Sequence, residues 1–579
     1  MPAELRISLG QCSDRGRKPA NQDFHGALIP NEPLLNLKGI AVVIADGISS
    51  SDVSHIASES AVKSFLTDYY CTSESWSVKT SAQRVLAATN AWLHSQTRRS
   101  QCAYDKDKGY VCTLSAMVIK SATAHIFHAG DCRIYRLAGN TLEQLTDDHR
   151  VIVSSEQTYL GRALGINPQI EIDYQALPIE KEDIFLLATD GVYEHVGARF
   201  VAAALKDHSA DLDKAAKVIV DEALRRGSQD NLTIQIVRID ELPPNGVGEA
   251  FQPSSELPLP PLLEARAAFE GYRIVRELHA SPRSHIYLAV DRDTDALVGI
   301  KIPSIDLRDD PSYLKRFMVE EWVARRIDSP HVLKPCQPSR KRNYLYVAME
   351  FVDGQTLRQW MIDNPKPDLE TVRGIVEQIA KGLRAFHRKE MLHQDLRPDN
   401  IMIDKTGTAK IIDFGATKIA GIAEAVSSVG QNDILGTAQY TAPEYFRGER
   451  GSPRSDMFSL GVIAYQMLTG KLPYGAQIAQ ARTKSQFGKL RYRPASDGNR
   501  DIPAWMDAAL RCAVNPDPRK RYESLSEFTH DLRHPNPNYL NASPTPLIER
   551  NPNLFWKCTT AILALIVIAL LVSQQGVGR

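Results

Sequence analysis

A proline-rich stretch near the middle of the chain limits how much of it can belong to one folded unit. Six prolines lie between Glu241 and Pro261, and the stretch has no apolar period. Such a segment is an extended spacer rather than part of a hydrophobic core. A second stretch, 534–553, holds five more prolines. Because 579 residues are also too many for one core, we predict domains over 5–240 and 268–533, linkers over 241–267 and 534–553, and a C-terminal tail.

Short apolar runs in the front domain each meet an acidic residue at one end. Three runs lead into Asp46, Asp131 and Asp190, and Asp230 opens a fourth run. Runs of this length that are rich in β-branched residues predict buried strands. Acids at strand ends can converge on one rim of a sheet, where divalent cations with oxygen ligands would compensate their repulsion. One such acid is as well explained by a turn or a helix cap, but the ordered set favours a metal site.

The ordered motifs resemble the PP2C family of metal-dependent Ser/Thr phosphatases over about 5–240. They are Asn-Gln-Asp (21–23), Ala-Asp-Gly (45–47), Gly-Asp-Cys-Arg (130–133), Ala-Thr-Asp-Gly-Val (188–192) and Asp-Asn-Leu-Thr (230–233). The resemblance implies an α/β-β/α sandwich that binds two Mn²⁺ or Mg²⁺ ions and a third, looser ion. The implied ligands are Asp46, Asp190 and Asp230, completed by Asp23 and the Gly47 carbonyl, with Asp131 for the third ion.

Two residues of this domain are expected to act on the substrate rather than on the metal. The resemblance implies that Arg17 grips the phosphate, with Lys18 as the alternative in the same register. Many relatives have glycines and often a histidine after the Ala-Asp-Gly motif, where this chain reads Ile-Ser-Ser-Ser. His55 lies nearby in the sequence, but no motif assigns it the role of general acid.

The rear domain carries the parts of a phosphotransfer site in order. Val-Gly-Ile-Lys301 ends an apolar run, and Glu320 lies nineteen residues later in a helical pattern, with Glu321 as the alternative partner for the lysine. These motifs resemble those of the protein kinases, and the resemblance implies that the segment Ala-Met349-Glu350-Phe351 is the hinge that would receive adenine, with Met349 as gatekeeper.

The loop His-Gln-Asp-Leu-Arg-Pro-Asp-Asn (393–400) and Asp-Phe-Gly (413–415) complete the set. Over about 268–533 the chain thus resembles the bilobal bacterial Hanks-type Ser/Thr kinases. The resemblance implies that Lys301 holds the ATP phosphates, Asp395 accepts the proton of the substrate hydroxyl, Arg397 supplies positive charge, and Asn400 and Asp413 bind Mg²⁺.

Two departures bear on activity. The segment from Leu278 to Ile286, which would cover the nucleotide, has no glycine, so its backbone amides should approach phosphates less closely. Gln394 replaces the arginine that reads an activation-loop phosphate in many kinases. We expect an active kinase, since every charged part is present. A nucleotide-binding pseudokinase that regulates the phosphatase, or a membrane scaffold without catalysis, are the alternatives.

The C-terminal tail contains an apolar run. Residues 558–572 carry no charge, and with Leu554, Phe555 and Trp556 the run approaches the length of a bilayer span. A buried helix of a globular domain is the alternative. We predict a transmembrane tail anchor over 554–573, with the catalytic domains on the cytoplasmic side of the inner membrane because Arg550 and Lys557 precede the run.

The expected fold is therefore α+β and multidomain, with a PP2C-like sandwich, a bilobal kinase and one transmembrane helix. The charge balance of 69 basic and 69 acidic residues gives no electrostatic support for a nucleic-acid partner. We expect a bifunctional signalling enzyme that uses ATP and Mg²⁺ in its kinase half and acts on protein serines and threonines. Its own kinase half is a further expected substrate for dephosphorylation, since the linker keeps the two sites at high effective concentration.

Overall fold

The structure is a computed structural model. It describes residues 4–102, 105, 108–154, 157–243, 257–281, 283–307, 310–336, 340, 342–420, 439–475, 477–480, 486–487, 490–497, 501–537 and 555–566. The chain separates into two compact units. The first comprises Met1–Phe351, Arg384–His393 and Asp413–Asp433, and the second comprises Val352–Leu383, Gln394–Ile412 and Ile434–Arg579.

The front part of the first unit is built on two five-stranded sheets. One sheet has the order β1–β12–β11–β6–β7, and its strands are β1 (Arg6–Asp14), β12 (Leu232–Glu241), β11 (Ile184–Ala188), β6 (Arg133–Ala138) and β7 (Thr141–Gln144). The other has the order β10–β5–β4–β3–β2, and its strands are β10 (Asp173–Pro178), β5 (Thr123–Ala129), β4 (Leu114–Lys120), β3 (Ile40–Asp46) and β2 (Asp23–Leu28). A hairpin, β8 (Arg150–Ser154) and β9 (Gln157–Leu160), stands apart from both sheets.

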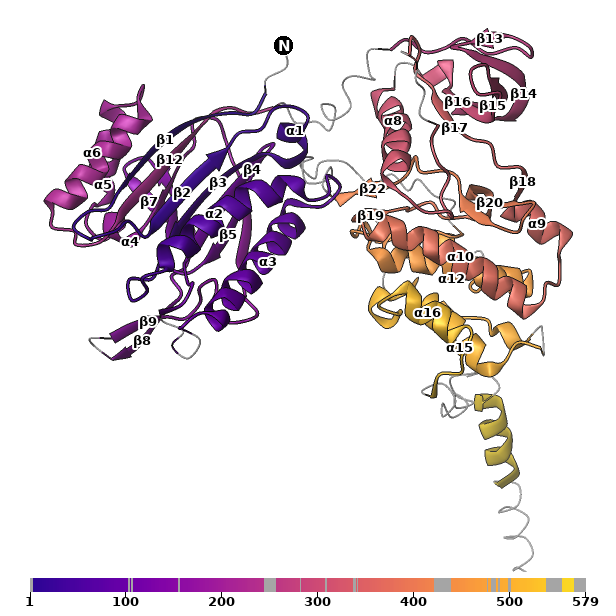
Figure 1. The fold of residues 1–579 in the computed structure, drawn as a ribbon. Helices are drawn as coiled ribbons and strands as arrows, with labels where there is room; N and C mark the ends of the chain where they lie inside the picture. Colours follow the sequence, from indigo (N-terminus) through magenta and orange to yellow (C-terminus); the bar gives the residue numbers. More distant parts are fainter. Residues whose placement is uncertain are drawn as a thin grey trace, which may run out of the picture. The chain divides into compact units, whose positions relative to one another are not determined.

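Helices cover the outer face of each sheet (Figure 1). They are α1 (Leu34–Lys38), α2 (Ser54–Cys71) and α3 (Val78–Arg99) beside the second sheet, and α4 (Asp190–Tyr193), α5 (Ala198–Asp207) and α6 (Leu212–Arg225) beside the first. Strand β3 shows why the layers form, because its side chains alternate between two cores. Ala41 and Val43 pack with α2 and α3, whereas Val42 and Ile44 pack between the two sheets. A third core joins α5 and α6 to the first sheet.

The rest of the first unit holds a third five-stranded sheet, here called the smaller sheet because β13 has only two residues, and one long helix. The sheet has the order β13–β14–β15–β16–β17, and its strands are β13 (Ala268–Phe269), β14 (Tyr272–Ala280), β15 (Ser284–Asp291), β16 (Leu297–Pro303) and β17 (Val347–Glu350). The 3-10 turn η3 (Ile305–Leu307) leads to α8 (Pro311–Arg326). Two short strands, β19 (Met391–Leu392) and β22 (Lys418–Ile419), pair with each other and bracket the segment that contains Asp413.

The second unit is mostly helical. Its helices are α9 (Leu357–Asp363), α10 (Leu369–His387, of which the part up to Leu383 belongs here), α12 (Pro453–Thr469), α13 (Gln477–Gln480), α15 (Ala504–Ala513) and α16 (Leu525–Asp531). Its strands are β18 (Gly354–Thr356), β20 (Ile401–Asp404) and β21 (Ala409–Ile411), and its 3-10 turns are η4 (Pro398–Asn400), η5 (Tyr445–Arg447), η6 (Ala495–Asp497) and η7 (Pro518–Lys520). Helix α12 begins with a capping box between Ser452 and Ser455 and ends at Gly470 in the left-handed conformation. It is buried over most of its length, as a central helix must be.

The predicted transmembrane helix over 554–573 is wrong on this structure. Across the ranges described above, no helix combines the length and the apolar character that a bilayer crossing requires. The helical segment described in the tail runs over 555–566. Residues 554 and 567–573 lie outside the described ranges. The predicted fold class is corrected at this point, and the predictions of membrane attachment and of a location at the inner membrane, which rested on the same span, are wrong with it.

Candidate active sites

Five acidic residues meet at one end of the front sandwich. Asp23 opens β2 and lies directly opposite Asp46, the last residue of β3. Asp131 follows β5, where the chain crosses from one sheet to the other. Asp190 opens α4 directly after β11, and Asp230 comes two residues before β12. The sequence-predicted metal acids are therefore brought together from both sheets.

Burial and mutual repulsion make the negative charges of this cluster unfavourable. Burial is the first cause that raises the pKa of Asp46, and the charges of Asp23, Asp190, Asp131 and Asp230 raise it further. Burial also raises the pKa of Asp23 to about 6 and that of Asp190 to about 7, where neighbouring carboxylates again add to the effect. A cluster of this kind is stabilised as carboxylates only by added positive charge.

The donor atoms fit a hard divalent ion. Asp23 Oδ1 and Asp190 Oδ1 are buried and have no hydrogen-bond partner, and carboxylate oxygens are the ligands that Mg²⁺ and Mn²⁺ favour. Among the described residues, however, no group of three or more His, Cys, Asp or Glu side chains stands in a ready metal-binding arrangement. Two cationic side chains lie among the acids: Lys18 pairs with Asp230, and Arg150 pairs with Asp131 and Asp190.

Neighbouring polar groups hold the acids in place. Thr189 donates its hydroxyl to Asp23 Oδ2 at 2.9 Å, and this contact joins the two sheets. The buried Asn231 side chain receives the amide of Gln22 at 2.9 Å and donates to the carbonyl of Arg15 at 2.9 Å, which fixes the β1–β2 loop beside Asp230. Gly191 permits the close approach of α4, because a Cβ there would lie 2.0 Å from the carbonyl oxygen of Asn231.

The structure separates the two candidate phosphate-binding residues. Lys18, rather than Arg17, reaches the acid cluster, and its ammonium also donates to the Ser49 hydroxyl at 2.6 Å. Arg17 is exposed on the same loop. His55 lies on the exposed side of the first turn of α2. Sequence reasoning missed Arg150, because no motif signals that the first residue of β8 would reach these acids.

In the smaller sheet, Lys301 on β16 forms a buried ion pair with Glu320 on α8. The ammonium donates to both carboxylate oxygens, at 2.8 and 2.6 Å, and lies 3.8 Å from Asp413 Oδ1. These two carboxylates outweigh burial and hold the pKa of Lys301 above its usual value. The neighbouring Glu321 instead pairs with Arg342 and Arg325. Lys301, Glu320 and Asp413 thus form one charged cluster.

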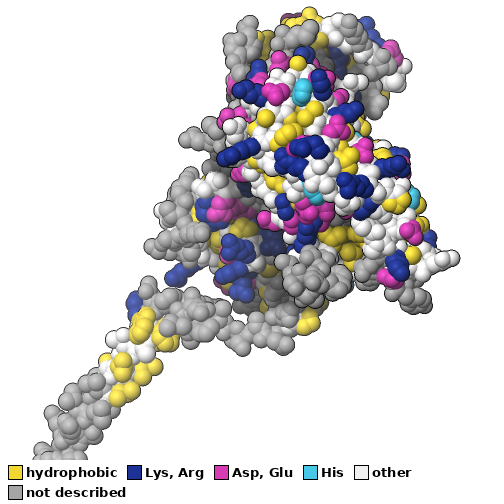
Figure 2. All heavy atoms as spheres, turned by 90° about the vertical axis from the view of Figure 1, so that its left-hand side faces the viewer, with side chains coloured by type: hydrophobic (Ala, Val, Ile, Leu, Met, Phe, Trp, Pro, Cys, Tyr) yellow, Lys and Arg dark blue, Asp and Glu magenta, His cyan; other side chains and the backbone are white. Residues whose placement is uncertain are grey.

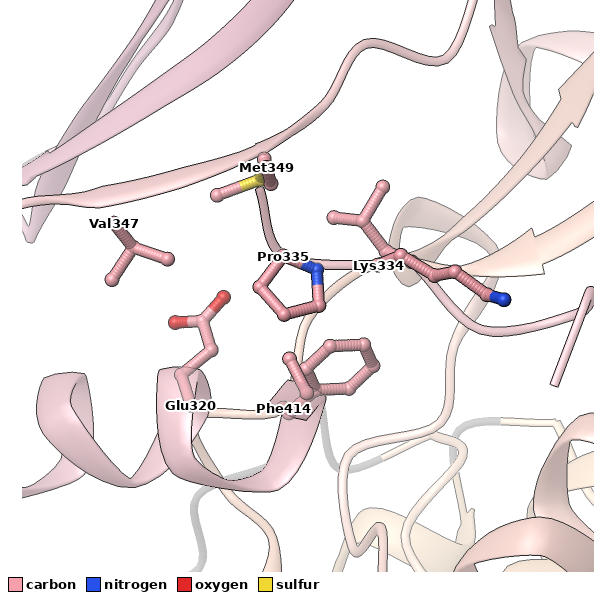
Figure 3. Close-up of a pocket in the computed structure, with 8 residues that line it drawn as sticks. Glu320, Lys334, Pro335, Val347, Met349 and Phe414 are labelled. Carbon is pink, nitrogen blue, oxygen red and sulfur yellow. The ribbon is translucent and has the colours of Figure 1, made fainter. Parts of the chain in front are cut away.

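The space behind this cluster is tightly packed (Figure 3). Glu320, Pro335, Val347, Met349 and Phe414 line a cavity of about 10 Å³, which has room for at most one water molecule. Met349 is buried there, and Glu350 and Phe351 follow it at the end of the strand.

Aromatic rings secure the Asp-Phe-Gly segment in the same unit. The ring of Phe414 lies 5.5 Å from Phe386 and 6.5 Å from His393, measured between centroids. Phe414 is itself fully buried. This packing holds Asp413, the residue before it, close to Lys301.

The hairpin between β14 and β15 closes on itself where a glycine-rich loop would be open. Leu278 and Ile286 lie on these strands, and Ser281 sits at the turn. The Ser281 hydroxyl accepts the backbone amide of Ser284 at 3.0 Å, and the Ser281 amide donates to the Ser284 carbonyl at 3.0 Å. The hairpin thus lacks glycine, and in addition its Ser284 backbone amide is already hydrogen-bonded to the Ser281 side chain.

In the second unit, the catalytic-loop residues form their own cluster. Asn400 donates its side-chain amide to the carbonyl of Asp395 at 2.9 Å and to Asp395 Oδ2 at 3.1 Å. Arg397 Nε lies 4.0 Å from Asp395 Oδ2. The Gln394 amide donates to Asp456 Oδ1 at 3.0 Å, and Gln394 has a φ of 67°. Asp456 therefore holds the loop that carries Asp395 and Arg397 at a residue with a left-handed backbone.

A second buried ion pair stabilises this unit. Arg521 donates to both oxygens of Glu444, each at 2.8 Å, and both side chains are buried. The bidentate geometry fixes the segment before η5 against the region of η7.

On the face drawn in Figure 2, basic and acidic side chains are interspersed among the described residues.

Comparisons with known proteins find two domain families on this chain. Residues 13–232 match protein phosphatase 2C, and residues 272–535 match the protein kinase domain. The serine/threonine-protein kinase PrkC of Bacillus subtilis is 29% identical over 270 residues, which cover 45% of this chain and 40% of PrkC. PknB of Mycobacterium leprae, also named a serine/threonine-protein kinase, is 32% identical over 256 residues, which cover 43% of this chain and 40% of PknB. The chain thus spans about two fifths of the length of these curated relatives. The solved serine/threonine phosphatase of S. agalactiae aligns over 41% of this chain and 100% of its own, with 21% identity and a TM-score of 0.35.

Proposed function

We propose that this chain, which joins a protein phosphatase 2C domain to a Hanks-type protein kinase domain, both phosphorylates protein serines and threonines with ATP and removes such phosphates. The observation that carries the proposal is that one chain holds both charged clusters: the five acids of the sandwich, and Lys301 with Glu320 and Asp413. The curated relatives that match the rear domain are named serine/threonine-protein kinases.

In the kinase half, the residues act by holding charge in position. Lys301, fixed by Glu320, would bind the ATP phosphates, and Asp413 with Asn400 would hold Mg²⁺. Asp395 would orient the substrate hydroxyl and accept its proton, and Arg397 would add positive charge beside the transferred phosphoryl group. The adenine would lie against Met349, Glu350 and Phe351, beneath the hairpin that carries Leu278 and Ile286. The closed packing behind Glu320 supports this role, because it keeps the Lys301 partner from moving.

In the phosphatase half, Asp46, Asp190 and Asp230 would hold two Mn²⁺ or Mg²⁺ ions, with Asp23 and the Gly47 carbonyl completing their coordination. Such a pair lowers the pKa of a bridging water and neutralises phosphoryl oxygens. The chain's own residues would bind and orient the phosphoprotein: Arg17 or Lys18 would grip its phosphate. Lys18 has the support of geometry, since it already lies beside Asp230.

One observation favours a second candidate function. The Ser281 hydroxyl occupies the Ser284 amide, which a nucleotide phosphate would otherwise use, so the rear domain could bind nucleotide weakly and regulate the phosphatase without transferring phosphate. A protein scaffold without catalysis is the third class. These readings differ in what the purified chain does to ATP and to a phosphate ester.

The experiment uses the full chain with two matched site variants, each serving as the other's control. Asp413→Ala is expected to abolish transfer of label from γ-labelled ATP to the chain or to a generic protein, with ester hydrolysis intact. Asp46→Ala is expected to abolish Mn²⁺-dependent hydrolysis of p-nitrophenyl phosphate, with label transfer intact. Absent transfer in the wild-type chain, together with hydrolysis that responds to ATP, would establish the pseudokinase instead. Hydrolysis that persists in chelator would refute the metal assignment.

The kinase half itself is a proposed substrate of the phosphatase half. Five hydroxyls between Asp413 and Glu444 are candidate sites: Thr417 and Thr441 are buried, whereas Ser427, Ser428 and Thr437 lie outside the described residues. Mass spectrometry of the wild-type chain and Asp46→Ala measures the phosphate occupancy of each site. Higher occupancy in the variant is expected, and equal occupancy would exclude self-dephosphorylation.

A further inference from the structure

Arg150 occupies the acid cluster from outside the motifs. It is the first residue of β8, and its guanidinium reaches three acids: Nε lies 2.8 Å from Asp131 Oδ2, Nη2 lies 3.2 Å from Asp190 Oδ2, and Nη1 lies 3.0 Å from Glu194 Oε1. Nη2 also donates to the Tyr193 hydroxyl at 3.2 Å. A guanidinium placed in this way supplies the positive charge that the carboxylates lack.

The backbone beside Arg150 is fixed against the turn that carries Asp131. The His149 amide donates to the Gly130 carbonyl at 2.8 Å, and the Gly130 amide donates to His149 Nδ1 at 3.1 Å. The other ring nitrogen of His149 lies 2.9 Å from Asp173. Tyr193 closes the arrangement, since its hydroxyl donates to the Asp131 carbonyl at 3.1 Å. The hydrogen bonds of His149 therefore fix the backbone from which the Arg150 side chain reaches Asp131.

The contacts divide the oxygens of the cluster into two groups. Arg150 takes Asp190 Oδ2, but Asp190 Oδ1 and Asp23 Oδ1 remain buried and have no hydrogen-bond partner. The free oxygens belong to acids that the proposed function assigns to the first two ions. The oxygens held by Arg150 lie toward Asp131, the acid assigned to the looser third ion.

We propose that Arg150 is a built-in competitor for divalent metal at Asp131, so that it sets the affinity of the weakest ion and affects the two inner ones much less, because Asp190 Oδ1 and Asp23 Oδ1 stay free of it. The inference rests on the proposed phosphatase function. An ion that uses Asp131 Oδ2 must displace the guanidinium, and the guanidinium, if it remained nearby, would repel the ion. Both effects weaken metal binding in the wild-type chain, so removal of the arginine tightens it. An arginine that only braces the hairpin would have the opposite effect, since its removal would loosen Asp131.

The test measures Mn²⁺ binding to the full chain, by electron paramagnetic resonance of free Mn²⁺, for the wild type, Arg150→Ala and Arg150→Lys. Arg136→Ala is the matched control, because Arg136 forms an arginine–aspartate pair with Asp183 in the same domain, and its side chain is 27% exposed against 28% for Arg150. In Arg150→Ala we expect the weakest Mn²⁺ to bind about tenfold tighter. This is the scale of losing two partly exposed ion pairs, those of Arg150 with Asp131 and Asp190. The inner ions should stay within about twofold, and Arg136→Ala should match the wild type.

An unchanged or weaker outer ion in Arg150→Ala would overturn the inference while leaving the proposed phosphatase function standing. A wild-type chain that binds no Mn²⁺ would overturn both. If Arg150→Ala does not fold, Arg150→Lys decides the question. A lysine keeps the charge but lacks the fork that reaches three acids, so a tightening of about twofold to threefold is expected, and no tightening would refute the competition.

Discussion

The buried pair of Lys301 and Glu320 offers the sharpest test of how the kinase half is held together. Glu320→Ala removes the carboxylate that receives both hydrogen bonds from the ammonium. The exposed fractions of the two residues are 9% and 4%, so solvent cannot take the place of the lost partner. Breaking a buried pair on one side costs about 3–5 kcal/mol, because an uncompensated charge stays buried.

The distance from Asp413 to Lys301 indicates which end of this range of unfolding free energy applies to Glu320→Ala. It lies 3.8 Å from the Lys301 ammonium, so the lysine keeps one partner when Glu320 is removed. We therefore expect the low end, about 3 kcal/mol, for Glu320→Ala. Combining Glu320→Ala with Lys301→Met removes both charges of the pair and should cost less than Glu320→Ala alone. The coupling energy between the two positions should then be about 3 kcal/mol.

The assay follows the free energy of unfolding of the small sheet in the full chain, by urea-dependent hydrogen exchange of peptides from β16. Glu321→Ala is the matched control, because Glu321 is the next residue on α8 and pairs with Arg342 rather than Lys301. Its effect should add to that of Lys301→Met without coupling. Additive effects of Lys301→Met and Glu320→Ala, with a coupling energy below about 0.5 kcal/mol, would refute the view that the pair is one buried unit.

Three further predictions concern the acid cluster and the hairpin. Burial raises the pKa of Asp23 from its ordinary value of 3.8 to about 6, so in chelator its contribution to stability is present at low pH and is lost as pH rises through about 6. The slope of unfolding free energy against pH between 4 and 7 should flatten in Asp23→Asn or with Mn²⁺, and equal slopes in chelator would contradict the assignment. Gly16 has a φ of 59°, and a Cβ there would lie 2.2 Å from the Asp230 carbonyl oxygen. Gly16→Ala should therefore lower the free energy of unfolding by about 2 kcal/mol or more, measured by thermal unfolding. An unchanged melting temperature would argue against this loop geometry. Ser281→Gly frees the Ser284 amide and should tighten ATP binding several-fold by calorimetry, whereas unchanged affinity would show that the hairpin does not limit nucleotide binding.

Four of the five acids of the sandwich could be predicted from sequence because each stands at one end of an apolar run. Strand ends in a two-sheet sandwich can gather at one rim, so the local pattern was enough to bring Asp46 and Asp190 together. Asp23 followed instead from the resemblance to the phosphatases. Helical spacing left both Glu320 and Glu321 as partners for Lys301, and the resemblance to the kinases favoured Glu320, which forms the pair.

The remaining features depend on contacts between segments that no local pattern connects. Arg150 reaches Asp190 across 40 positions of sequence, and the closure of the β14–β15 hairpin by Ser281 depends on hydroxyl geometry. The tail shows the opposite error, because an apolar composition favoured a membrane span, whereas no helix among the described residues is long and apolar enough to make one.

The five acids lie at the seam, the region where the two sheets of the sandwich meet. This position affects which substitutions a screen for survival after heating would favour. In chelator, like charges at the seam oppose the packing of β3 against β11 and β12, so neutral substitutions there are expected to raise heat resistance. With Mn²⁺ present, the same substitutions should remove ligands of the proposed metal ions and so lower heat resistance. A library screened for survival after heating, once in each condition, would therefore enrich and deplete the same few positions with opposite sign. The resulting pattern would outline the metal centre without any measurement of catalysis.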